Sequence, residues 1–487
     1  MKRISILILT LSVFCISCKK FLDINTSPNS PTSVPPATLL PTTTVAIAFA
    51  NSNDLNRASS ALIQHIAGTA NQTAAYDVYL LDGSFDNQWN SEIYNGAVNN
   101  LQILIDQNSA TNPAYSGIAK LELAYAFSMA TDIWGEVPYS QAGHGLQYEN
   151  PRFDSVQSIY QGNAALGIVG LLDLVKSGLA DLLKPSVLKP GADDIVYKGD
   201  LTKWARMGNT LLLKFAIMMT NVNPTLAAST ISSVITGNNY INATTLDFEV
   251  PFGVSVGNQN PIYTFNYLNR PGDQMLSQRL LNLERSLNDT IRLSKFFTKP
   301  TGQFVAFDNG STAPPPLQAT RSRYNNYLVG ADANGNPTGQ APIRLLTYFQ
   351  VQFILAESAL VLGTAGSANT YYQAGITANM LKIGMTQAEI DNYFLTNPTI
   401  VTLSGTPAQQ LKQIITQKYI AWIGNGIEAY DDYRRTLYPT LTLVNNPQGD
   451  NPNVIPTRFP YPASELSRNP NAPNPRPKTD VKLWWAK

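Results

Sequence analysis

Helical periodicity dominates the chain from residue 45 onward. Apolar residues recur at intervals of three and four positions, with polar residues on the opposite side, which is the pattern of helices that bury one face. We therefore expect a mostly α-helical protein. The stretches with this pattern are residues 46–70, 89–105, 117–134, 153–183, 201–218, 345–362 and 411–435.

Several residues predict where these helices begin and end. Gly135 and Pro138 should end the helix of residues 117–134, because glycine is typical of helix C-termini and proline cannot continue a helix. Asp200 is placed to cap the first turn of the helix that follows it. Residues 345–362 are apolar almost all round, so we expect this helix in the centre of the core.

Three stretches lack the helical pattern. Residues 71–87 are polar and aromatic, and residues 238–307 and 444–487 are rich in Asn, Gly and Pro, with few runs long enough for a helix. They predict long irregular excursions from a helical scaffold. Loops of such length are usually either functional or disordered, and the aromatic content of these favours a function.

The first eighteen residues have the order of an export signal. Lys2 and Arg3 precede an apolar run over residues 4–16, and Ser17 stands directly before Cys18. The run of 13 residues is shorter than the roughly 20 that cross a bilayer, so it predicts a cleaved signal. A cysteine at the cleavage site is typical of bacterial lipoproteins, in which its thiol is acylated. An ordinary secretory signal is the alternative.

This interpretation divides the chain into three parts. Residues 1–17 are a lipoprotein signal peptide, residues 18–44 a lipidated extended tether rich in proline, and residues 45–487 the folded part. The two cysteines, Cys15 and Cys18, both belong to the N-terminal region. The folded part therefore has no cysteine for a disulfide or a nucleophilic thiolate.

The composition disfavours a nucleic-acid partner. Only 14% of the residues are charged and the formal net charge is +1, whereas binding a polyphosphate needs a concentrated Lys and Arg surface. The abundant polar residues are neutral ones, namely Asn, Thr, Ser, Gln and Tyr. Such neutral donors and acceptors suit a surface that meets neutral polyols, although they also suit plain solubility.

No catalytic constellation can be assembled from the sequence. The two histidines, His65 and His144, are far apart in the chain, and no metal or cofactor motif accompanies them. Asp132 and Glu136 have the residue types of a glycosidase pair, but their place at a helix end favours a structural role. We therefore expect a protein without catalytic activity, metal or cofactor.

Two charged residues interrupt apolar helix faces. Glu357 lies in the middle of residues 345–362, and Lys418 lies on the apolar side of residues 411–435. Burying either charge alone would be costly, and a partner removes much of the penalty. We predict that both are buried and that each has a polar or charged partner, with a mutual pair as one option.

Aromatic residues among amides and carboxylates are the candidates for ligand binding, because a sugar ring stacks on an aromatic face while its hydroxyls bind neutral polar groups. For any single ring the alternative is a place in the core, and for Trp89, at a helix start, that alternative is the stronger. As a group in a loop these residues favour a ligand. The candidates are Tyr76, Tyr79, Phe85 and Trp89 in one region, and Tyr267 and Arg270 in another.

Several motifs together resemble the SusD/RagB family of outer-membrane lipoproteins of Bacteroidetes, in particular its SusD-like branch. They follow one another in the expected order over nearly the whole chain after Cys18. The motifs are Asp23-Ile24-Asn25 and residues 131–142, 199–204, 288–292, 354–359, 417–422 and 455–462.

The resemblance implies one domain over residues 45–487, in which helical hairpins similar to tetratricopeptide repeats carry irregular loops. It also implies a lipoprotein of the cell outer membrane, anchored through Cys18 and facing the exterior, that captures oligosaccharides such as starch. The expected partner is a SusC-like TonB-dependent transporter. Peptide or other nutrient capture on the same scaffold is one alternative, and a lipid-anchored glycoside hydrolase is a weaker one.

Overall fold

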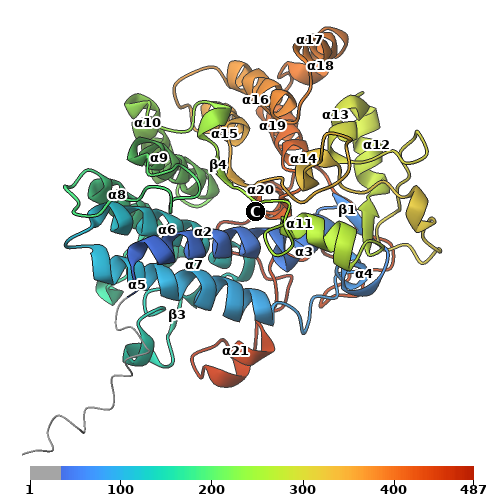
Figure 1. The fold of residues 1–487 in the computed structure, drawn as a ribbon. Coiled ribbons are helices and arrows are strands. Elements are labelled where there is room, and N and C mark those ends of the chain that lie inside the picture. The colour runs from blue at the N-terminus through green and yellow to red at the C-terminus, as the bar shows by residue number, and fades with distance from the viewer. Residues whose placement is uncertain (1–33) are drawn as a thin grey trace, which may run out of the picture.

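The fold is built from helices that pack in pairs (Figure 1). The structure, a computed structural model, describes residues 34–487, so the predicted signal peptide and the lipidation site Cys18 lie outside the described residues. The larger helices are α2 (Pro36–Ser52), α3 (Asp54–Leu62), α5 (Asn99–Asn108), α6 (Pro113–Trp134), α8 (Leu171–Leu182), α9 (Leu201–Met218), α10 (Pro224–Gly237), α15 (Tyr348–Val361), α16 (Ala368–Lys382), α17 (Gln387–Thr396), α19 (Pro407–Ala421) and α20 (Gly426–Thr436).

Successive helices contact one another along the chain, α5 with α6, α8 with α9, α9 with α10, and α15 with α16. Helix α6 also packs on α8, and α15 packs on α19, which joins neighbouring pairs into one core. In Figure 1, α5, α6, α8, α9 and α10 lie on the blue to green side, and α15, α16 and α19 lie on the orange side. The expected scaffold of helical hairpins, similar to tetratricopeptide repeats, is confirmed.

Strands play a small part in the described chain. They form three two-stranded antiparallel sheets, each of which ties distant loops together. The pairs are β1 (Ile66–Gly68) with β5 (Gln274–Leu276), β2 (Val137–Pro138) with β3 (Phe153–Asp154), and β4 (Phe248–Val250) with β6 (Ile343–Leu346).

The end of the predicted tether is helical, which corrects the expectation for residues 36–44. Helix α2 begins at Pro36, in the first turn, where proline is well tolerated because its missing N–H has no partner in a helix anyway. Leu39 and Leu40 are buried, and the hydroxyl of Thr44 lies 2.5 Å from the carboxyl of Glu122. The burial of these side chains outweighs the preference of the proline-rich composition for an extended loop.

Residues 153–183 do not form the single long helix that was expected. They form β3, α7 (Val156–Gln161), a 3-10 turn at Ala164–Leu166, and α8. The chain turns at Gly162, where φ is +80°, and a Cβ on Gly170 would lie 2.3 Å from the Gly162 nitrogen. Only glycines permit this close turn.

The predicted helix of residues 411–435 is likewise two helices. Helix α19 ends before Gly424, which has a φ of +99°, and the Asn425 side chain then caps α20 by accepting from the Glu428 N–H. The break lets α20 turn back across the core, where it contacts α3 and α6.

The excursion of residues 238–307 contains more helix than expected. Helices α12 (Gln278–Ser286) and α13 (Thr290–Phe296) lie within it. The Ser277 hydroxyl accepts from two N–H groups of the first turn of α12, and Leu280 and Leu293 are buried. A good cap and a few buried side chains are enough for helices of two turns.

The second long excursion, residues 444–487, folds back onto the end of α6. The indole of Trp134 donates to the Pro460 carbonyl at 3.0 Å, and the Phe459 N–H donates to the Ile133 carbonyl at 2.9 Å. The buried Trp485 indole donates to the Asp132 carboxylate at 3.0 Å. The motif around residues 131–142 is therefore a junction that holds the C-terminal segment.

The prediction for the two interrupting charges is confirmed. Glu357 is buried and accepts from the Arg435 guanidinium, and Lys418 is buried and lies 2.8 Å from Asp432. Arg435 also contacts Asp432 at 2.8 Å, so Glu357 and Lys418 belong to one chain of alternating charges without touching. Burial would raise the pKa of Asp432, but the Lys418 and Arg435 cations hold that pKa below its usual value.

Candidate ligand-binding pocket

The first group of predicted ligand residues lies in the core. Tyr76, Tyr79, Phe85 and Trp89 expose 0, 1, 3 and 2% of their surface. Tyr76 stacks on Phe85 with 5.6 Å between ring centroids, and Phe85 in turn packs on Phe459 at 4.6 Å. Burial raises the pKa of the Tyr79 hydroxyl to about 12. The ring faces of this group therefore contact protein, and only Tyr79 and Trp89 reach the walls of open pockets.

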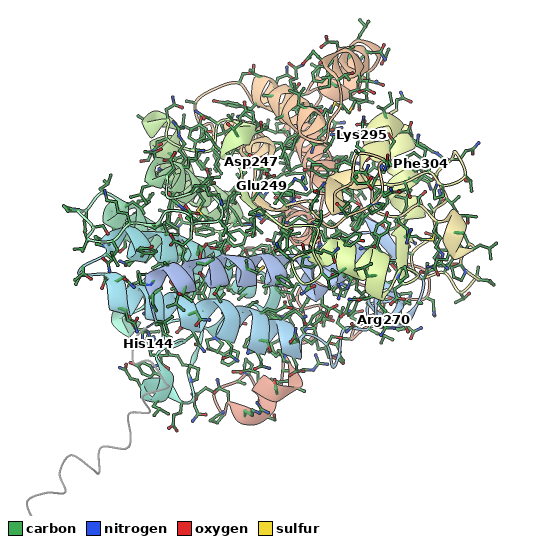
Figure 2. The ribbon with its side chains drawn as sticks, in the orientation of Figure 1. His144, Asp247, Glu249, Arg270, Lys295 and Phe304 are labelled. Carbon is green, nitrogen blue, oxygen red and sulfur yellow. The ribbon has the colours of Figure 1, made fainter. Side chains whose placement is uncertain are left out.

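The second predicted group lies elsewhere on the molecule. Tyr267 is half-buried between Tyr263, at 5.6 Å between ring centroids, and the Arg323 guanidinium, and its hydroxyl donates to the Tyr324 carbonyl at 2.6 Å. Arg270 is exposed. Figure 2 places Arg270 far from His144, which lies beside the pocket described next, so the two predicted groups do not form one site.

An open pocket with both aromatic and amide groups lies beside Trp89. We call it the Trp89 pocket; its volume is about 280 Å³. Its walls come from η1 (Gln88–Val98), the loop of residues 138–151, and α21 (Ala463–Arg468). Its aromatic, amide and charged lining residues are Trp89, Asn90, Tyr94, Asn99, Gln141, Tyr148, Glu149, Asn150, Glu465, Arg468 and Asn469.

The base of the Trp89 pocket is rigid. Trp89 packs edge-on against Trp134, with 5.0 Å between ring centroids, and its indole N–H donates to Glu465 at 3.3 Å. The Asn469 amide donates to the other oxygen of Glu465 at 2.9 Å. Burial raises the pKa of Glu465, and these two donors oppose that shift. The contacts join η1 to α21.

A second set of hydrogen bonds holds α21 in place. The Asn90 amide donates to the Ser464 hydroxyl at 2.9 Å, and the Ser464 N–H donates to the Asp86 carboxylate at 3.1 Å. On the opposite wall the Tyr94 hydroxyl donates to the Pro138 carbonyl at 2.8 Å. The pocket is therefore formed before any ligand arrives.

The mouth of the Trp89 pocket carries the groups that a ligand would meet. Tyr148 is 37% exposed, and its ring lies 6.1 Å from that of His144. Arg468, at the end of α21, is exposed, and the amides of Asn99 and Asn150 line the same opening. A ring face beside neutral amides and one guanidinium can stack a sugar and hydrogen-bond its hydroxyls.

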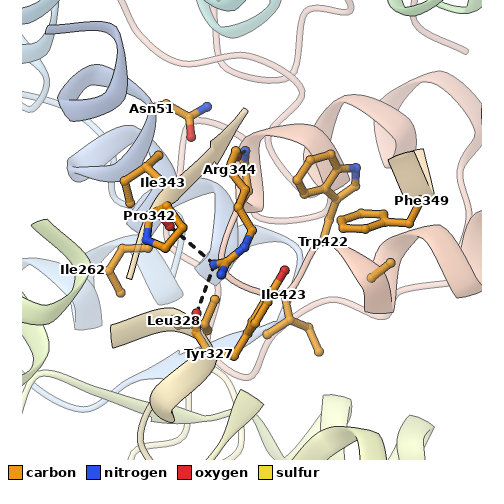
Figure 3. Close-up of a pocket in the computed structure, with 13 residues that line it drawn as sticks. Asn51, Ile262, Tyr327, Leu328, Pro342, Ile343, Arg344, Phe349, Trp422 and Ile423 are labelled. Carbon is orange, nitrogen blue, oxygen red and sulfur yellow. Dashed lines mark hydrogen bonds between the residues drawn. The ribbon is translucent and has the colours of Figure 1, made fainter. Parts of the chain in front are cut away.

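Two other cavities fit a sugar less well. The pocket beside Tyr79, of about 360 Å³, presents two carboxylates, Asp82 and Asp450, which Arg476 bridges at 2.9 and 3.1 Å. The central cavity shown in Figure 3, between Arg344 and Trp422, has a volume of about 20 Å³. That is close to the space for a single water molecule, so the central cavity excludes a sugar.

The carboxylates considered for catalysis do not face each other across a cleft. Asp132 is fully buried and accepts from the Tyr160 hydroxyl at 2.8 Å, and burial raises its pKa to about 6. Glu136 pairs instead with Arg458 at 3.4 Å. This supports the structural role expected for Asp132 and Glu136.

Residues 34–487 lack two further features, a metal-binding cluster and a membrane-spanning helix. No cluster of three or more His, Cys, Asp or Glu side chains in this range is placed to hold a metal ion. No helix in the same range is long and apolar enough to cross a membrane.

Sequence reasoning missed most of the pocket. Tyr148 lies in a short 3-10 segment, Gly145–Tyr148, and Glu465 and Arg468 lie in the C-terminal excursion. The one clue was an aromatic residue among Gly and Asn in residues 143–150. Nothing in the local sequence indicated that this loop meets residues more than 300 positions away.

Comparisons with known proteins agree with the fold. A family model of SusD-like proteins, described as starch-binding and associating with the outer membrane, matches residues 28–462. No curated protein matches the chain significantly.

Many solved structures share the fold. A chitin-binding protein superposes with a TM-score of 0.78 at 23% identity, covering 93% of this chain and 100% of its own. A SusD/RagB family protein from Bacteroides thetaiotaomicron gives 0.76 at 22% identity, with 93% and 99% covered. A chitin-binding SusD homologue from Flavobacterium johnsoniae gives 0.72 at 20% identity, with 92% and 97% covered.

Proposed function

The chain belongs to the SusD-like family of starch-binding proteins that associate with the outer membrane, and on that premise we propose that it captures oligosaccharides in the Trp89 pocket. Bound sugar is then passed, without chemical change, to a SusC-like TonB-dependent transporter. The protein is held at the outer face of the outer membrane by acyl groups on Cys18.

The observation that carries this proposal is the exposed Tyr148 ring above a preformed pocket lined by amides. Affinity comes from stacking of the C–H face of a sugar on Tyr148 and from hydrogen bonds to Asn99, Asn150 and Arg468. Because most of these contacts are neutral, binding depends only weakly on salt concentration.

Chitin and starch oligosaccharides are the first ligands to test. Two of the similar structures are described as chitin-binding proteins, and the family model is described as starch-binding. Both polymers are neutral, which agrees with a pocket whose lining contains several amides and few charges.

The test is calorimetric titration of the soluble form, beginning after Cys18, with chitin and starch oligosaccharides. We expect saturable binding to one class, a loss of about tenfold or more in the Tyr148→Ala variant, and little change in Tyr148→Phe, because truncating an aromatic anchor of a binding site costs about 2 kcal/mol or more. Tyr148 is partly exposed, so both variants should fold.

Two outcomes would count against the proposal. Undiminished glycan binding by Tyr148→Ala would remove the Trp89 pocket from the site. Saturable binding of peptides, with no glycan bound, would favour the alternative of peptide capture on this scaffold.

A further inference from the structure

A second open groove lies on another part of the scaffold, between α12, α18 (Pro398–Val401) and α19. We call it the Gln417 groove; its volume is about 600 Å³, which is the largest of the pockets described within residues 34–487. Leu283, Leu287 and Ile400 form an apolar wall, and α19 forms the facing wall.

The face of α19 that lines the groove is polar throughout. Its residues follow the spacing i, i+3, i+4, i+7 and i+8, which places them on one side of a helix. A face that neighbouring elements partly cover is usually apolar. Here the five residues are Gln409, Lys412, Gln413, Thr416 and Gln417.

Two of these polar residues have a structural task. The Gln409 carbonyl oxygen accepts from the Thr406 N–H at 2.8 Å, which completes the N-terminal cap of α19. The Gln413 carbonyl oxygen accepts from the Ser404 N–H at 3.0 Å. Both amides therefore hold the rim of the groove. Their contacts do not account for the polar residues at the other three positions, Lys412, Thr416 and Gln417.

The amide of Gln417, a residue of the groove wall, is held in one orientation. Gln417 is 1% exposed, and its oxygen accepts from the Arg292 guanidinium at 2.6 Å. Arginine can only donate, so the amide cannot be reversed, and the NH₂ group is the end left for another acceptor. Within residues 34–487 this NH₂ group donates to no acceptor.

The groove is also electropositive. Lys412 is the one charged residue that lines it, and no carboxylate within the described residues pairs with that ammonium group. Beneath Gln417 the Arg292 guanidinium pairs with Asp289 at 2.5 Å. Burial holds the pKa of Glu284 well above its usual value, and the neighbouring Asp289 adds to the shift, while the Arg292 cation opposes it.

From these contacts we infer that the Gln417 groove is a second binding site, which takes a sugar that carries a carboxylate. A carboxylate only accepts hydrogen bonds, and the groove offers the Gln417 amide, the Thr416 hydroxyl and the Lys412 ammonium as donors. The apolar wall of Leu283, Leu287 and Ile400 accommodates the C–H face of a sugar ring.

This site is independent of the Trp89 pocket. The Trp89 pocket contains Glu149 and Glu465 with one guanidinium, that of Arg468, and therefore disfavours an acidic sugar. The two sites would let one protein retain both neutral and acidic residues of a mixed glycan.

The test compares glucuronic acid with glucose. The two sugars differ only at C6, which is a carboxylate in glucuronic acid and a hydroxymethyl group in glucose. Saturation-transfer NMR and titration with the soluble form should show saturable glucuronate binding, at least about tenfold tighter than glucose, as expected for a charge-assisted hydrogen bond. The affinity should fall as salt is added.

Three variants locate the site. Lys412→Gln removes the charge from an exposed position, and Gln417→Glu keeps an oxygen for Arg292 while replacing the donor with a second oxygen. Each should weaken glucuronate binding about tenfold or more. Lys482→Gln, a matched change at an exposed lysine that does not line the groove, should have no effect.

The proposal fails if glucuronate and glucose bind alike, or if Lys412→Gln binds glucuronate as tightly as the unmodified chain does. Tyr148→Ala should leave glucuronate binding intact. Loss of glucuronate binding in Tyr148→Ala would place the acidic sugar in the Trp89 pocket instead.

Discussion

Glu122 is a fully buried carboxyl in α6 whose surroundings favour its neutral form. It lies 3.0 Å from the Thr43 hydroxyl and 2.5 Å from the Thr44 hydroxyl. Both hydroxyls donate to the carboxyl, and both also lie 2.9 Å from the Leu40 carbonyl. The two donors oppose the effect of burial on the carboxyl, and burial is the larger of the two effects.

The pKa of Glu122 makes stability depend on pH. Burial raises this pKa from 4.5 to about 8, so the folded protein keeps the proton while the unfolded chain releases it. The contribution is complete below about pH 4.5 and is lost as pH rises toward 8, at up to about 1.4 kcal/mol per pH unit.

The Glu122→Gln variant isolates this effect because glutamine has no proton to release. Its free energy of unfolding in urea, relative to the unmodified chain, should rise between pH 5 and pH 8. Parallel pH profiles for the two proteins would show that Glu122 is ionised in the fold.

The candidate aromatics show why single residues mislead. Tyr79 and Phe85 have φ values of +70° and +74°, and these left-handed turns fold residues 78–87, which follow helix α4 (Asn71–Asp77), inward. Phe85 then packs on Phe459, which lies in the C-terminal excursion. The composition of the loop was correctly recognised, but burial depended on a partner that local sequence does not reveal.

Helix starts are the features at element scale that sequence predicts best. The Asp200 carboxylate accepts from the N–H groups of Thr202 and Lys203 at 3.0 and 3.3 Å, as the sequence led us to expect. These hydrogen bonds lower the pKa of Asp200, with the Thr202 hydroxyl contributing most.

Replacing this cap should be costly only when the acceptor is lost. Asp200→Ala should lower the free energy of unfolding by about 1 kcal/mol, whereas Asp200→Asn should change it little, because Asn and Asp cap equally well. Thermal and urea unfolding of the pair would measure this. An equal loss in both variants would point to charge rather than capping.

Helix interiors were predictable where apolar residues recur with helical spacing, as in α6 and α9, or cover almost the whole helix, as in α15. The breaks between consecutive helices were not predictable, because they depend on single glycines. Gly162 and Gly424 end helices through positive φ values, yet the surrounding apolar periodicity continues through both. The start of α2 was missed for the opposite reason, since proline and threonine conceal a helix that packing stabilises.

At the scale of the whole molecule, the buried charges join separate parts of the core. Arg435 on α20 bridges Glu357 on α15 and Asp432, and Asp432 in turn holds Lys418 on α19. Sequence predicted that Glu357 and Lys418 would find partners, but not that Arg435 would connect them.

Removing Arg435 should therefore be severe. Arg435→Met leaves the Glu357 carboxylate buried without its partner and should cost about 3–5 kcal/mol in urea unfolding. Adding Glu357→Leu to Arg435→Met should recover part of this loss, because an apolar pair replaces the unpaired charge. Additive losses in the double variant would show that the two residues act separately.

The Trp89 pocket also belongs to this scale. Its two halves meet through hydrogen bonds between residues 376 and 374 positions apart, Trp89 with Glu465 and Asn90 with Ser464. Of the lining residues, local patterns located only Trp89, and the folded chain shows the rest.

The bond between Trp485 and Asp132 spans 353 residues and lies in the middle of the core. Helix α6 is made long before the segment that carries Trp485, so the Asp132 carboxylate lacks this one donor during much of synthesis. Contacts so distant along the chain slow folding.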